Sequence, residues 1–428
     1  MKVLSVFDGM ACGMLAMQRA GIKVKRYVAY EIEKYAVQTS THNFPMIEHR
    51  GDVFAADFTE FEGFDFVLAG FPCTKFSIAQ KNDRETKPYS GEGWDLFEQA
   101  WRAVCEAKPK YFLFENNKSM AKAVQQEISK IVGFEAICIN SALVSAQNRQ
   151  RLYWVGKRNE DGTYSKVPIE QPEDLGILLK DVLECGSGKP LSEREMDYMV
   201  RDSKGKYSDR WAYLQKPGES DKALCITANI SKGVPYNICA EPANMTSDGK
   251  AQCLRATCYK DGIRNMVGNT IDRKTCVAEP IRVGTWPNNA KNQAHDSQQY
   301  RIYSPDGKGV TLCGNGGGMG AKTGLYAIPV EFDGDTPIKA ISVADGKTYT
   351  VYEVKDGYIT IKGKRYAIKL DDGFYIIRKL TVRECMRLQT VPEWFEFPVS
   401  DTQAYKMLGN GWTVDVIAHL LKGCIKTN

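Results

Sequence analysis

Short apolar runs alternate with amphipathic stretches along the first 157 residues. Six runs have the length of strands: Val3–Phe7, Tyr27–Tyr30, Phe64–Ala69, Tyr111–Phe114, Phe134–Asn140 and Leu152–Gly156. Apolar residues at a spacing of three to four predict helices over Cys12–Ala20, Trp94–Ala107 and Ser119–Val132. This alternation predicts an α/β fold with a mostly parallel sheet. Ligands of such sheets bind at the carboxyl ends of the strands, so the residues that follow each run are the candidates for a site.

The pattern changes between about Gly186 and Ala340, where Gly, Ser, Asn, Asp and Lys separate very short apolar pieces. We expect a second, loop-rich domain there with no long helix. Three of its segments resemble one another: Lys222–Gly233, Ala251–Gly262 and Lys308–Gly320. Short strands are expected soon after the first and third, at Tyr236–Ala240 and Leu325–Ile328. True repeats and generic hairpins with recurring turn residues explain this similarity equally well.

The remainder of the chain alternates like a set of hairpins and then becomes helical again. The hairpin pattern covers Ile341–Arg378, in the segments KTYTVYEV, YITIKG and RYAIKL. Helices are expected at Thr381–Leu388, Tyr405–Leu408 and Thr413–Leu421.

Composition narrows the class of protein. With 428 residues, 43% hydrophobic and 25% charged, the chain can bury a sizeable core, and disordered, collagen-like and coiled-coil classes are excluded. No apolar run approaches a membrane span, and the run after Lys2 is too short for a signal peptide, so we expect neither membrane insertion nor export. Thirteen Cys without a CxxC pair, with four His, predict free thiols and no metal. The net charge of +5 suits nucleic acid only if it is clustered.

The turn after the first run carries the sequence FDGMACG, Phe7–Gly13. Its glycines allow close approach of a ligand, but their spacing is not the dinucleotide pattern G-x-G-x-x-G. Asp8 would repel a pyrophosphate, whereas a cationic or zwitterionic ligand suits it. Glu31, 22 residues after Gly9, follows the second run, where an acid can bind ribose hydroxyls, and Asp52 follows in a comparable place. An adenosine ligand without phosphates, such as S-adenosylmethionine, fits this turn; a plain tight turn is the alternative.

Two reactive groups follow the next runs. Pro72 stiffens the turn in FPCTKFS and presents Cys73 at the edge of the sheet, where a nucleophile would sit, although most Cys are simply small buried residues. Glu115 ends the run YFLF, so its carboxyl group and the thiol could share one pocket. In QNRQR, Gln147, Arg149 and Arg151 lie on one side if the segment is extended; a solvated basic turn explains them as well.

The motifs FDGMACG, GFPCTKFS, FENN, QNRQR, RKLTVRECMRLQTVP and KMLGNGWTVDVIAHL resemble, in this order, those of the DNA (cytosine-5) methyltransferases. The match covers about 1–157 and 378–428. This resemblance implies a methyltransferase (Rossmann-like) catalytic domain from 1–185 and 375–428, with an inserted, mainly β target-recognition domain at 186–374.

The resemblance also implies the chemistry. Cys73 would add to carbon 6 of a cytosine flipped out of duplex DNA, and Glu115 would hold or protonate ring nitrogen 3. Arg151 would contact the exocyclic oxygen, and Arg149 would support the pocket. Carbon 5 would then take the methyl group of S-adenosyl-L-methionine, giving 5-methylcytosine and S-adenosyl-L-homocysteine.

Two further sets of residues follow from the resemblance. The implied cofactor-binding residues are Phe7, Asp8, Gly9, Met10, Gly13, Glu31, Ile32, Asp52, Val53, Pro72, Leu96, Asn410 and Trp412. The expected DNA-binding residues are Ser77, Lys81, Gln147, Lys232, Lys260 and Lys322.

Three positions depart from the usual family pattern. Thr74 stands where Gln is usual, Asn117 where Val is usual, and Trp412 where a small residue is more common. Trp412 could reshape the methionine end of the cofactor pocket.

We expect a monomer in the cytoplasm of a bacterial or phage-infected cell, near the nucleoid, acting on double-stranded DNA, with a cognate restriction endonuclease as a partner. One rival is a tRNA methyltransferase with the same motifs, which the large insert disfavours. The intact Cys73, Glu115 and Arg151 argue against an inactive DNA-binding relative, and the glycine pattern argues against a nicotinamide-dependent oxidoreductase.

Overall fold

The computed structural model describes residues 1–72, 75–76, 84–184, 191, 193–200, 238–242, 282–285, 301–303, 338–341, 348–361, 363–367 and 372–426. The described residues divide into two compact units. The first holds those of Met1–Ile177 and Cys385–Asn428, and the second holds those between Leu178 and Glu384. The three repeat-like segments and Leu325–Ile328 lie outside the described residues. The roles expected for 1–185 with 375–428, and for 186–374, stay predictions.

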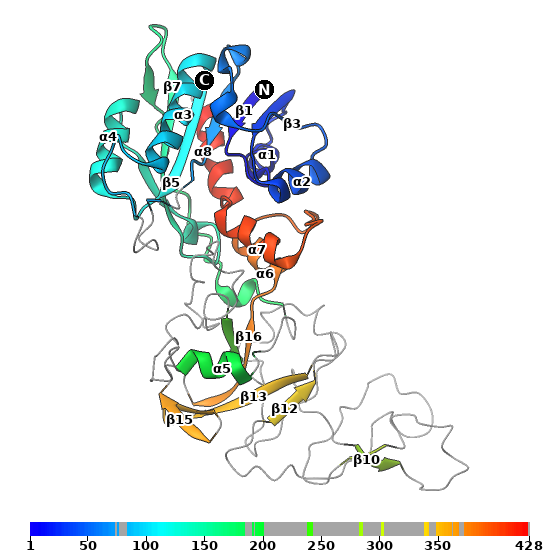
Figure 1. Ribbon diagram of the computed structural model, residues 1–428. Coiled ribbons are helices and arrows are strands. Elements are labelled where there is room, and N and C mark those ends of the chain that lie inside the picture. Colours follow the sequence, from blue (N-terminus) through cyan, green and yellow to red (C-terminus); the bar gives the residue numbers. More distant parts are fainter. Residues whose placement is uncertain are drawn as a thin grey trace. The chain divides into compact units, whose positions relative to one another are not determined.

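The first unit is built on an eight-stranded sheet with the order β3-β2-β1-β4-β5-β7-β6, and β8 pairs with β7 (Figure 1). The strands are β1 Lys2–Val6, β2 Arg26–Tyr30, β3 Glu48–His49, β4 Phe66–Ala69, β5 Tyr111–Asn117, β6 Ile137–Asn140, β7 Gln150–Arg158 and β8 Tyr164–Lys166. The five strands from β3 to β5 pair in parallel. β7 runs antiparallel to β5, β6 and β8. The expected α/β fold with a mostly parallel sheet is confirmed.

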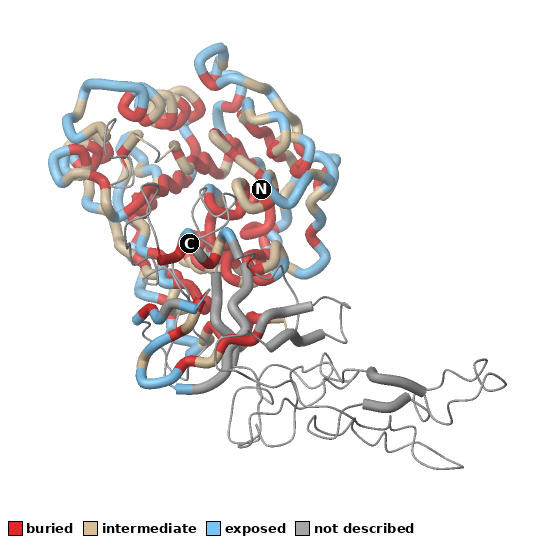
Figure 2. The backbone as a smooth tube through the Cα atoms, turned by 60° about the horizontal axis from the view of Figure 1, so that its bottom comes forward, coloured by how far each residue is buried: buried red, intermediate tan, exposed pale blue. Residues whose placement is uncertain are grey.

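Helices cover both faces of this sheet. Described helices of the first unit are α1 Cys12–Arg19, α2 Lys34–Asn43, α3 Glu92–Ala107, α4 Lys122–Val132, α7 Asp401–Asn410 and α8 Val414–Lys426, with 3-10 turns at Val53–Ala55, Phe58–Phe61 and Ser141–Leu143. Apolar residues of α3 and α4, such as Phe97 and Ile128, join Val67 and Phe114 of the sheet in one core cluster. Burial is densest along these central elements (Figure 2). α2 was not expected from the sequence.

The end of the chain packs on the start of it. Arg19 of α1 forms an ion pair with Asp415 of α8 at 2.8 Å. The Ser141 hydroxyl lies 2.8 Å from that of Thr413, and the Ser145 hydroxyl donates to the Leu388 carbonyl at 2.6 Å. These contacts hold the residues around α7 and α8 at the carboxyl edge of the sheet. The helices expected near Tyr405–Leu408 and Thr413–Leu421 are confirmed.

The second unit contains an antiparallel sheet with the order β15-β14-β13-β16-β9, and β12 pairs with β13. Its strands are β9 Ile238–Pro242, β12 Ile338–Ile341, β13 Thr348–Lys355, β14 Tyr358–Ile361, β15 Lys364–Ala367 and β16 Gly373–Lys379; β10 Arg282–Thr285 and β11 Arg301–Tyr303 form a separate pair. α5 Glu193–Val200, which the sequence did not predict, supplies Met196 and Met199 to a core with Val354 and Ile359. The hairpins expected in Ile341–Arg378 are confirmed.

Helix α6, Val382–Leu388, begins with a capping box. The boundary between the two units lies within this helix. The Thr381 hydroxyl accepts from the Glu384 amide at 3.0 Å, and the Glu384 carboxylate accepts from the Thr381 amide at 2.7 Å. The expected helix at Thr381–Leu388 is confirmed. None of the helices in the described part of the chain is long and apolar enough to cross a membrane.

Candidate active site

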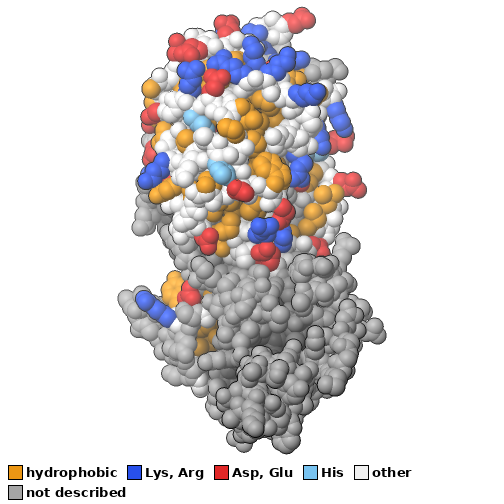
Figure 3. Space-filling model, turned by 90° about the vertical axis from the view of Figure 1, so that its right-hand side faces the viewer, with side chains coloured by type: hydrophobic (Ala, Val, Ile, Leu, Met, Phe, Trp, Pro, Cys, Tyr) orange, Lys and Arg blue, Asp and Glu red, His pale blue; other side chains and the backbone are white. Residues whose placement is uncertain are grey.

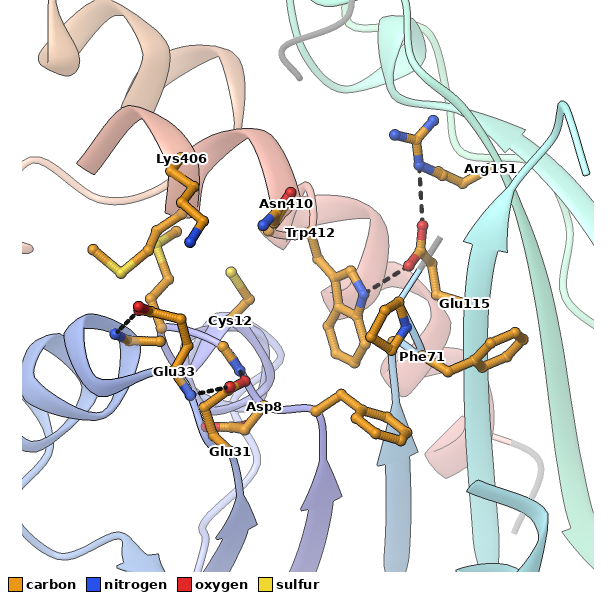
Figure 4. A pocket seen from close by; sticks show the side chains of 18 of the residues that line it. Asp8, Cys12, Glu31, Glu33, Phe71, Glu115, Arg151, Lys406, Asn410 and Trp412 are labelled. Atoms are coloured by element: carbon orange, nitrogen blue, oxygen red, sulfur yellow. Dashed lines mark hydrogen bonds and ion pairs between the residues drawn. The ribbon is translucent and has the colours of Figure 1, made fainter. Parts of the chain in front are cut away.

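A pocket opens at the carboxyl ends of the central strands of the first unit (Figure 4). It encloses about 990 Å³ of space, part of which is open solvent at its mouth. The lining residues come from the ends of β1, β2, β4 and β5, from the start of β7, from the first turns of α1 and α2, and from α7 and the turn after it. They are Phe7, Asp8, Gly9, Met10, Cys12, Glu31, Glu33, Ala36, Gly70, Phe71, Pro72, Glu115, Arg149, Arg151, Lys406, Met407, Asn410, Gly411 and Trp412.

The loop from β1 to α1 forms one wall, and Glu31 holds it in place. The Phe7 amide donates to the Tyr30 carbonyl at 2.9 Å, which ties the loop to the end of β2. Oε2 of Glu31 accepts from the Gly9 amide at 2.8 Å, and Oε1 accepts from the Ile32 and Glu33 amides at 2.9 and 2.8 Å. Gly9 adopts a φ of 61°, in the left-handed region that favours glycine. One carboxylate therefore shapes two loops at the pocket.

Asp8 is buried in the same wall. Its Oδ1 accepts from the Tyr27 hydroxyl at 2.6 Å, whereas Oδ2 accepts no hydrogen bond from the described residues. Burial raises the pKa of Asp8 to about 7, and the nearby Glu31 charge adds to this, against the lowering effect of the Ser5 and Tyr27 hydroxyls. An acid that changes charge near neutral pH thus lies beside the pocket.

Cys12 also lines the pocket, and the sequence analysis did not single it out. Burial raises the pKa of its thiol to about 12, with the Asp8 and Glu115 charges in the same direction. A thiol with such a pKa stays protonated at neutral pH, so Cys12 is a poor nucleophile. Its role in the pocket is packing.

The opposite wall carries a group of three side chains, of which Glu115 and Trp412 are buried and Arg151 is partly exposed. Oε1 of Glu115 lies 3.1 Å from Nε of Arg151, and Oε2 accepts from the indole nitrogen of Trp412 at 3.0 Å (Figure 4). Glu115 is 7% exposed, so both contacts form in a region largely shielded from water. The pairing of β5 with β7 places Arg151 opposite Asn117, two positions along from Glu115. This registry brings a carboxylate and a guanidinium together at the pocket.

Arg149 and Gln147 bind the returning C-terminal segment. The Arg149 guanidinium, 3% exposed, donates to the carbonyls of Gly409 and Gly411 at 3.2 and 2.8 Å. The Gln147 amide donates to the Leu388 carbonyl at 2.9 Å and to Oε1 of Gln389 at 3.1 Å. Gln147 is fully buried, and its side chain joins two segments of the fold; its expected contact with DNA stays a prediction.

The structure brings together many of the predicted cofactor and catalytic residues. Those that line the pocket are Phe7, Asp8, Gly9, Met10, Glu31, Pro72, Glu115, Arg149, Arg151, Asn410 and Trp412. Five predicted cofactor residues do not line it: Gly13, Ile32, Asp52, Val53 and Leu96. Ile32 is largely exposed, and the Asp52 carboxylate caps the turn at Val53–Ala55 by accepting from the Phe54 amide at 3.0 Å. Gly13 lies against Tyr27, where a Cβ would be 2.5 Å from its hydroxyl oxygen.

Several predicted residues lie outside the described residues: Cys73, Ser77, Lys81, Lys232, Lys260 and Lys322. The residues that precede Cys73 are described. Pro72 lines the pocket, and the Phe71 carbonyl accepts from the buried Asn116 amide at 3.0 Å. Pro72, the residue before Cys73 in the sequence, is therefore part of the pocket wall.

Sequence reasoning missed Glu33, Lys406 and several small or apolar residues of the lining. Lys406 and Gly411 both belong to the motif KMLGNGWTVDVIAHL, so membership of that motif was an available signal. Glu33 caps α2 by accepting from the Tyr35 and Ala36 amides, and that helix has few apolar positions to reveal it. Among the described residues, no group of His, Cys, Asp and Glu could hold a metal ion.

Comparisons with known proteins match this architecture. A family model described as C-5 cytosine-specific DNA methylase matches residues 1–426. The orphan methyltransferase M.Rho11sI of Bacillus phage rho11s is 25% identical over 516 residues, covering 100% of this chain and 98% of that protein. The type II methyltransferase M1.ScrFI of Lactococcus lactis subsp. cremoris is 26% identical over 320 residues, covering 71% and 73%. The structure of the Entamoeba histolytica methyltransferase EhMeth is similar in fold, with a TM-score of 0.54 at 13% identity, covering 100% of this chain and 98% of that one.

Proposed function

Because this chain belongs to the family of C-5 cytosine-specific DNA methylases, we propose roles for its pocket residues in methylating cytosine within duplex DNA. The family resemblance expected from the motifs is confirmed, and the chain is a DNA methyltransferase. One observation supports the proposal above the others: the Glu115–Arg151 pair lines the same pocket as Asp8, Glu31 and Pro72, and Pro72 directly precedes Cys73 in the sequence.

The charges of the pocket fit S-adenosylmethionine as the methyl donor. Asp8, Glu31 and Glu33 gather at one end, and the Lys406 ammonium reaches into the pocket from α7 (Figure 4). A donor with a sulfonium, an ammonium and one carboxylate suits three acids and one cation, whereas a pyrophosphate does not. When bound, this donor supplies a methyl group on a positively charged sulfur.

Different residues of the protein are proposed to act in the other steps of the reaction. The Cys73 thiolate forms a bond to carbon 6 of the flipped cytosine while the protonated form of Glu115 gives its proton to ring nitrogen 3, so that the electron pair of the 5,6 double bond moves to carbon 5. Carbon 5 takes the methyl group and loses its proton, and elimination of the Cys73 sulfur restores the aromatic ring. Arg151 contacts the exocyclic oxygen, and Arg149 fixes the segment that carries Asn410 and Trp412.

The DNA surface is proposed from the sequence. Ser77, Lys81, Lys232, Lys260 and Lys322 are proposed to contact DNA. On the face of the first unit in Figure 3, basic and acidic side chains are interspersed among apolar ones, so that face offers no uniformly basic surface. A place in restriction–modification is proposed from the name of the type II relative, whereas the phage relative is named an orphan methyltransferase. Modification of a short specific sequence and a cognate endonuclease stay predictions. The monomeric state and nucleoid association stay predictions.

The decisive experiment measures transfer of labelled methyl groups to unmethylated duplex DNA, followed by methylation-sensitive sequencing. Cys73→Ser is expected to abolish transfer while DNA binding persists. Cys105→Ser is the matched control, because Cys105 is an exposed residue of α3 outside the pocket, and it is expected to keep full activity. Full activity of Cys73→Ser would contradict the proposed nucleophile. Preferential methylation of transfer RNA, offered in the same assay, would contradict the DNA substrate.

A further inference from the structure

We infer that Trp412 is a positioning residue for the methyl transfer, because its indole N–H fixes the Glu115 carboxylate. The inference rests on the proposed role of Glu115 at the target base. Trp412 lies in the turn between α7 and α8, and Glu115 lies on β5, almost 300 positions earlier in the chain. The returning C-terminal segment therefore supplies one of the two contacts that hold this carboxylate.

The two oxygens of Glu115 are held by different donors. Arg151 lies 3.1 Å from Oε1 and carries a charge, whereas the indole N–H of Trp412 reaches Oε2 at 3.0 Å and is neutral. A carboxylate held at one oxygen alone can still rotate about its last side-chain bond. A second donor on the other oxygen removes that freedom, so the plane of the carboxylate is set before a base arrives.

Gly70 makes the contact possible. A Cβ at this position would lie 2.6 Å from the indole nitrogen of Trp412 and 2.9 Å from its neighbouring ring carbon. Such distances are too short for real Cβ contacts, so any larger residue at Gly70 would move the ring. Gly70 comes directly after β4 and three residues before Cys73. The ring thus packs between the strand end that leads to the proposed nucleophile and the strand that carries the proposed acid.

Trp412 also lines the donor pocket, and it is only 9% exposed. In Figure 4 its indole lies between the loop of Asp8 and the Glu115 carboxylate. A packing role against the donor would affect donor binding, whereas a positioning role through Glu115 would affect the rate of the chemical step. These two roles are separable by kinetics.

The test compares Trp412→Phe with the unmodified enzyme in single-turnover methyl transfer and in donor binding. Phe keeps an aromatic ring and removes the N–H, so the rate should fall about tenfold to a hundredfold, the range for a hydrogen bond to a charged group. The dissociation constant of S-adenosylmethionine should change less than threefold. Trp154→Phe is the control, because it removes a buried indole N–H that donates to Ser129 at 3.0 Å, in the core beside α4. It should leave the rate unchanged.

Two double variants complete the design. If Trp412 acts through Glu115, adding Trp412→Phe to Glu115→Gln should lower the rate less than twofold further. Gly70→Ala alone should slow transfer, and it should add little to Trp412→Phe because the smaller ring leaves room for the methyl group. Weakened donor binding at an unchanged rate, or fully additive losses with Glu115→Gln, would overturn the inference. An active Glu115→Gln enzyme would instead contradict the proposed role of Glu115 itself.

Discussion

The hydroxyl of Tyr27 donates a 2.6 Å hydrogen bond to Oδ1 of Asp8, at the end of the pocket where the acidic residues gather. Tyr27 lies near the start of β2 and Asp8 follows the neighbouring strand β1, so the bond joins β2 to the loop at the carboxyl end of β1. It occupies one oxygen of the carboxyl group and leaves Oδ2 without a hydrogen bond from the described residues. The group is thus held in place by one oxygen, and its other oxygen is buried beside the pocket without such a bond.

Donor binding should therefore depend on pH. The pKa of Asp8 is raised by burial to about 7, so the group is mostly neutral at pH 6 and mostly charged at pH 8. A cationic donor prefers the charged form, and its affinity should increase as the pH rises through 7. Titration calorimetry at pH 6, 7 and 8, repeated in buffers of different ionisation enthalpy, should also detect proton release at pH 7.

Asp8→Asn is the matched variant for this prediction, since it keeps the shape and an acceptor for Tyr27. Its affinity for S-adenosylmethionine should be independent of pH in this range and lower than that of the unmodified enzyme at pH 8. S-adenosylhomocysteine, which lacks the sulfonium charge, reports how much of the effect belongs to that charge. An equal pH dependence in the variant would assign the titration to another group.

The same carboxyl group should affect folding stability without any ligand. Its pKa is about 7 in the folded protein, against 3.8 for an unperturbed aspartic acid, so the folded state holds the proton more tightly. The free energy of unfolding from this group is therefore greatest below pH 4 and falls as the pH rises from about 4 to about 7. Asp8→Asn should raise stability at pH 8 by a few kcal/mol, about 1.4 kcal/mol for each unit of the shift, with little change at pH 4. Urea denaturation at both pH values checks this, and equal effects at both would contradict it.

The sheet of the first unit was predictable because buried strands consist of nearly continuous apolar runs. β4 and β5 are buried along their whole length. The ends of these two apolar runs indicated Glu115 and the turn before Cys73 as candidates for the site. α2 was not predictable from periodicity, because only Ala36, Thr39 and Ser40 of its ten residues are buried. It is helical chiefly through the Glu33 cap and its packing. The order of the strands in the sheet could not be predicted either, because apolar runs carry no information about which strands pair.

Residues of the candidate site that belong to one of the sequence motifs could be predicted. Contacts between segments that lie far apart in the chain could not. The hydrogen bond from Trp412 to Glu115 joins two motifs far apart in the chain. Gln147, a polar residue beside two arginines, is buried against the returning segment, a contact that its own motif does not reveal. The missing side chain at Gly13 was expected to leave space for a ligand, whereas in the structure the Tyr27 side chain lies in that space.

Gly13→Ala should consequently disturb the Asp8–Tyr27 pair. The new Cβ would lie 2.5 Å from the Tyr27 hydroxyl oxygen and 2.9 Å from a methyl carbon of Leu68. Overpacking of this kind costs about 1 to 3 kcal/mol of stability. In a Tyr27→Phe background the nearest obstacle is gone, so the same substitution should cost clearly less. Thermal unfolding of the four proteins checks the prediction, and equal costs in both backgrounds would show that Leu68, not Tyr27, sets the limit.

The Arg149 guanidinium should stabilise the donor pocket from the side of the C-terminal segment. It is buried and donates to the carbonyls on both sides of Asn410, at Gly409 and Gly411. Arg149→Met keeps the apolar stem but removes these donors and leaves buried carbonyls without them, so stability should fall by about 2 to 4 kcal/mol. Because the same turn carries Asn410 and Trp412, donor affinity should also fall. Gln150→Met, at the exposed neighbouring position, is the control and should change neither quantity. If Arg149→Met lost stability but bound the donor normally, the turn would keep its shape without the guanidinium, and Arg149 would be a residue of the fold alone.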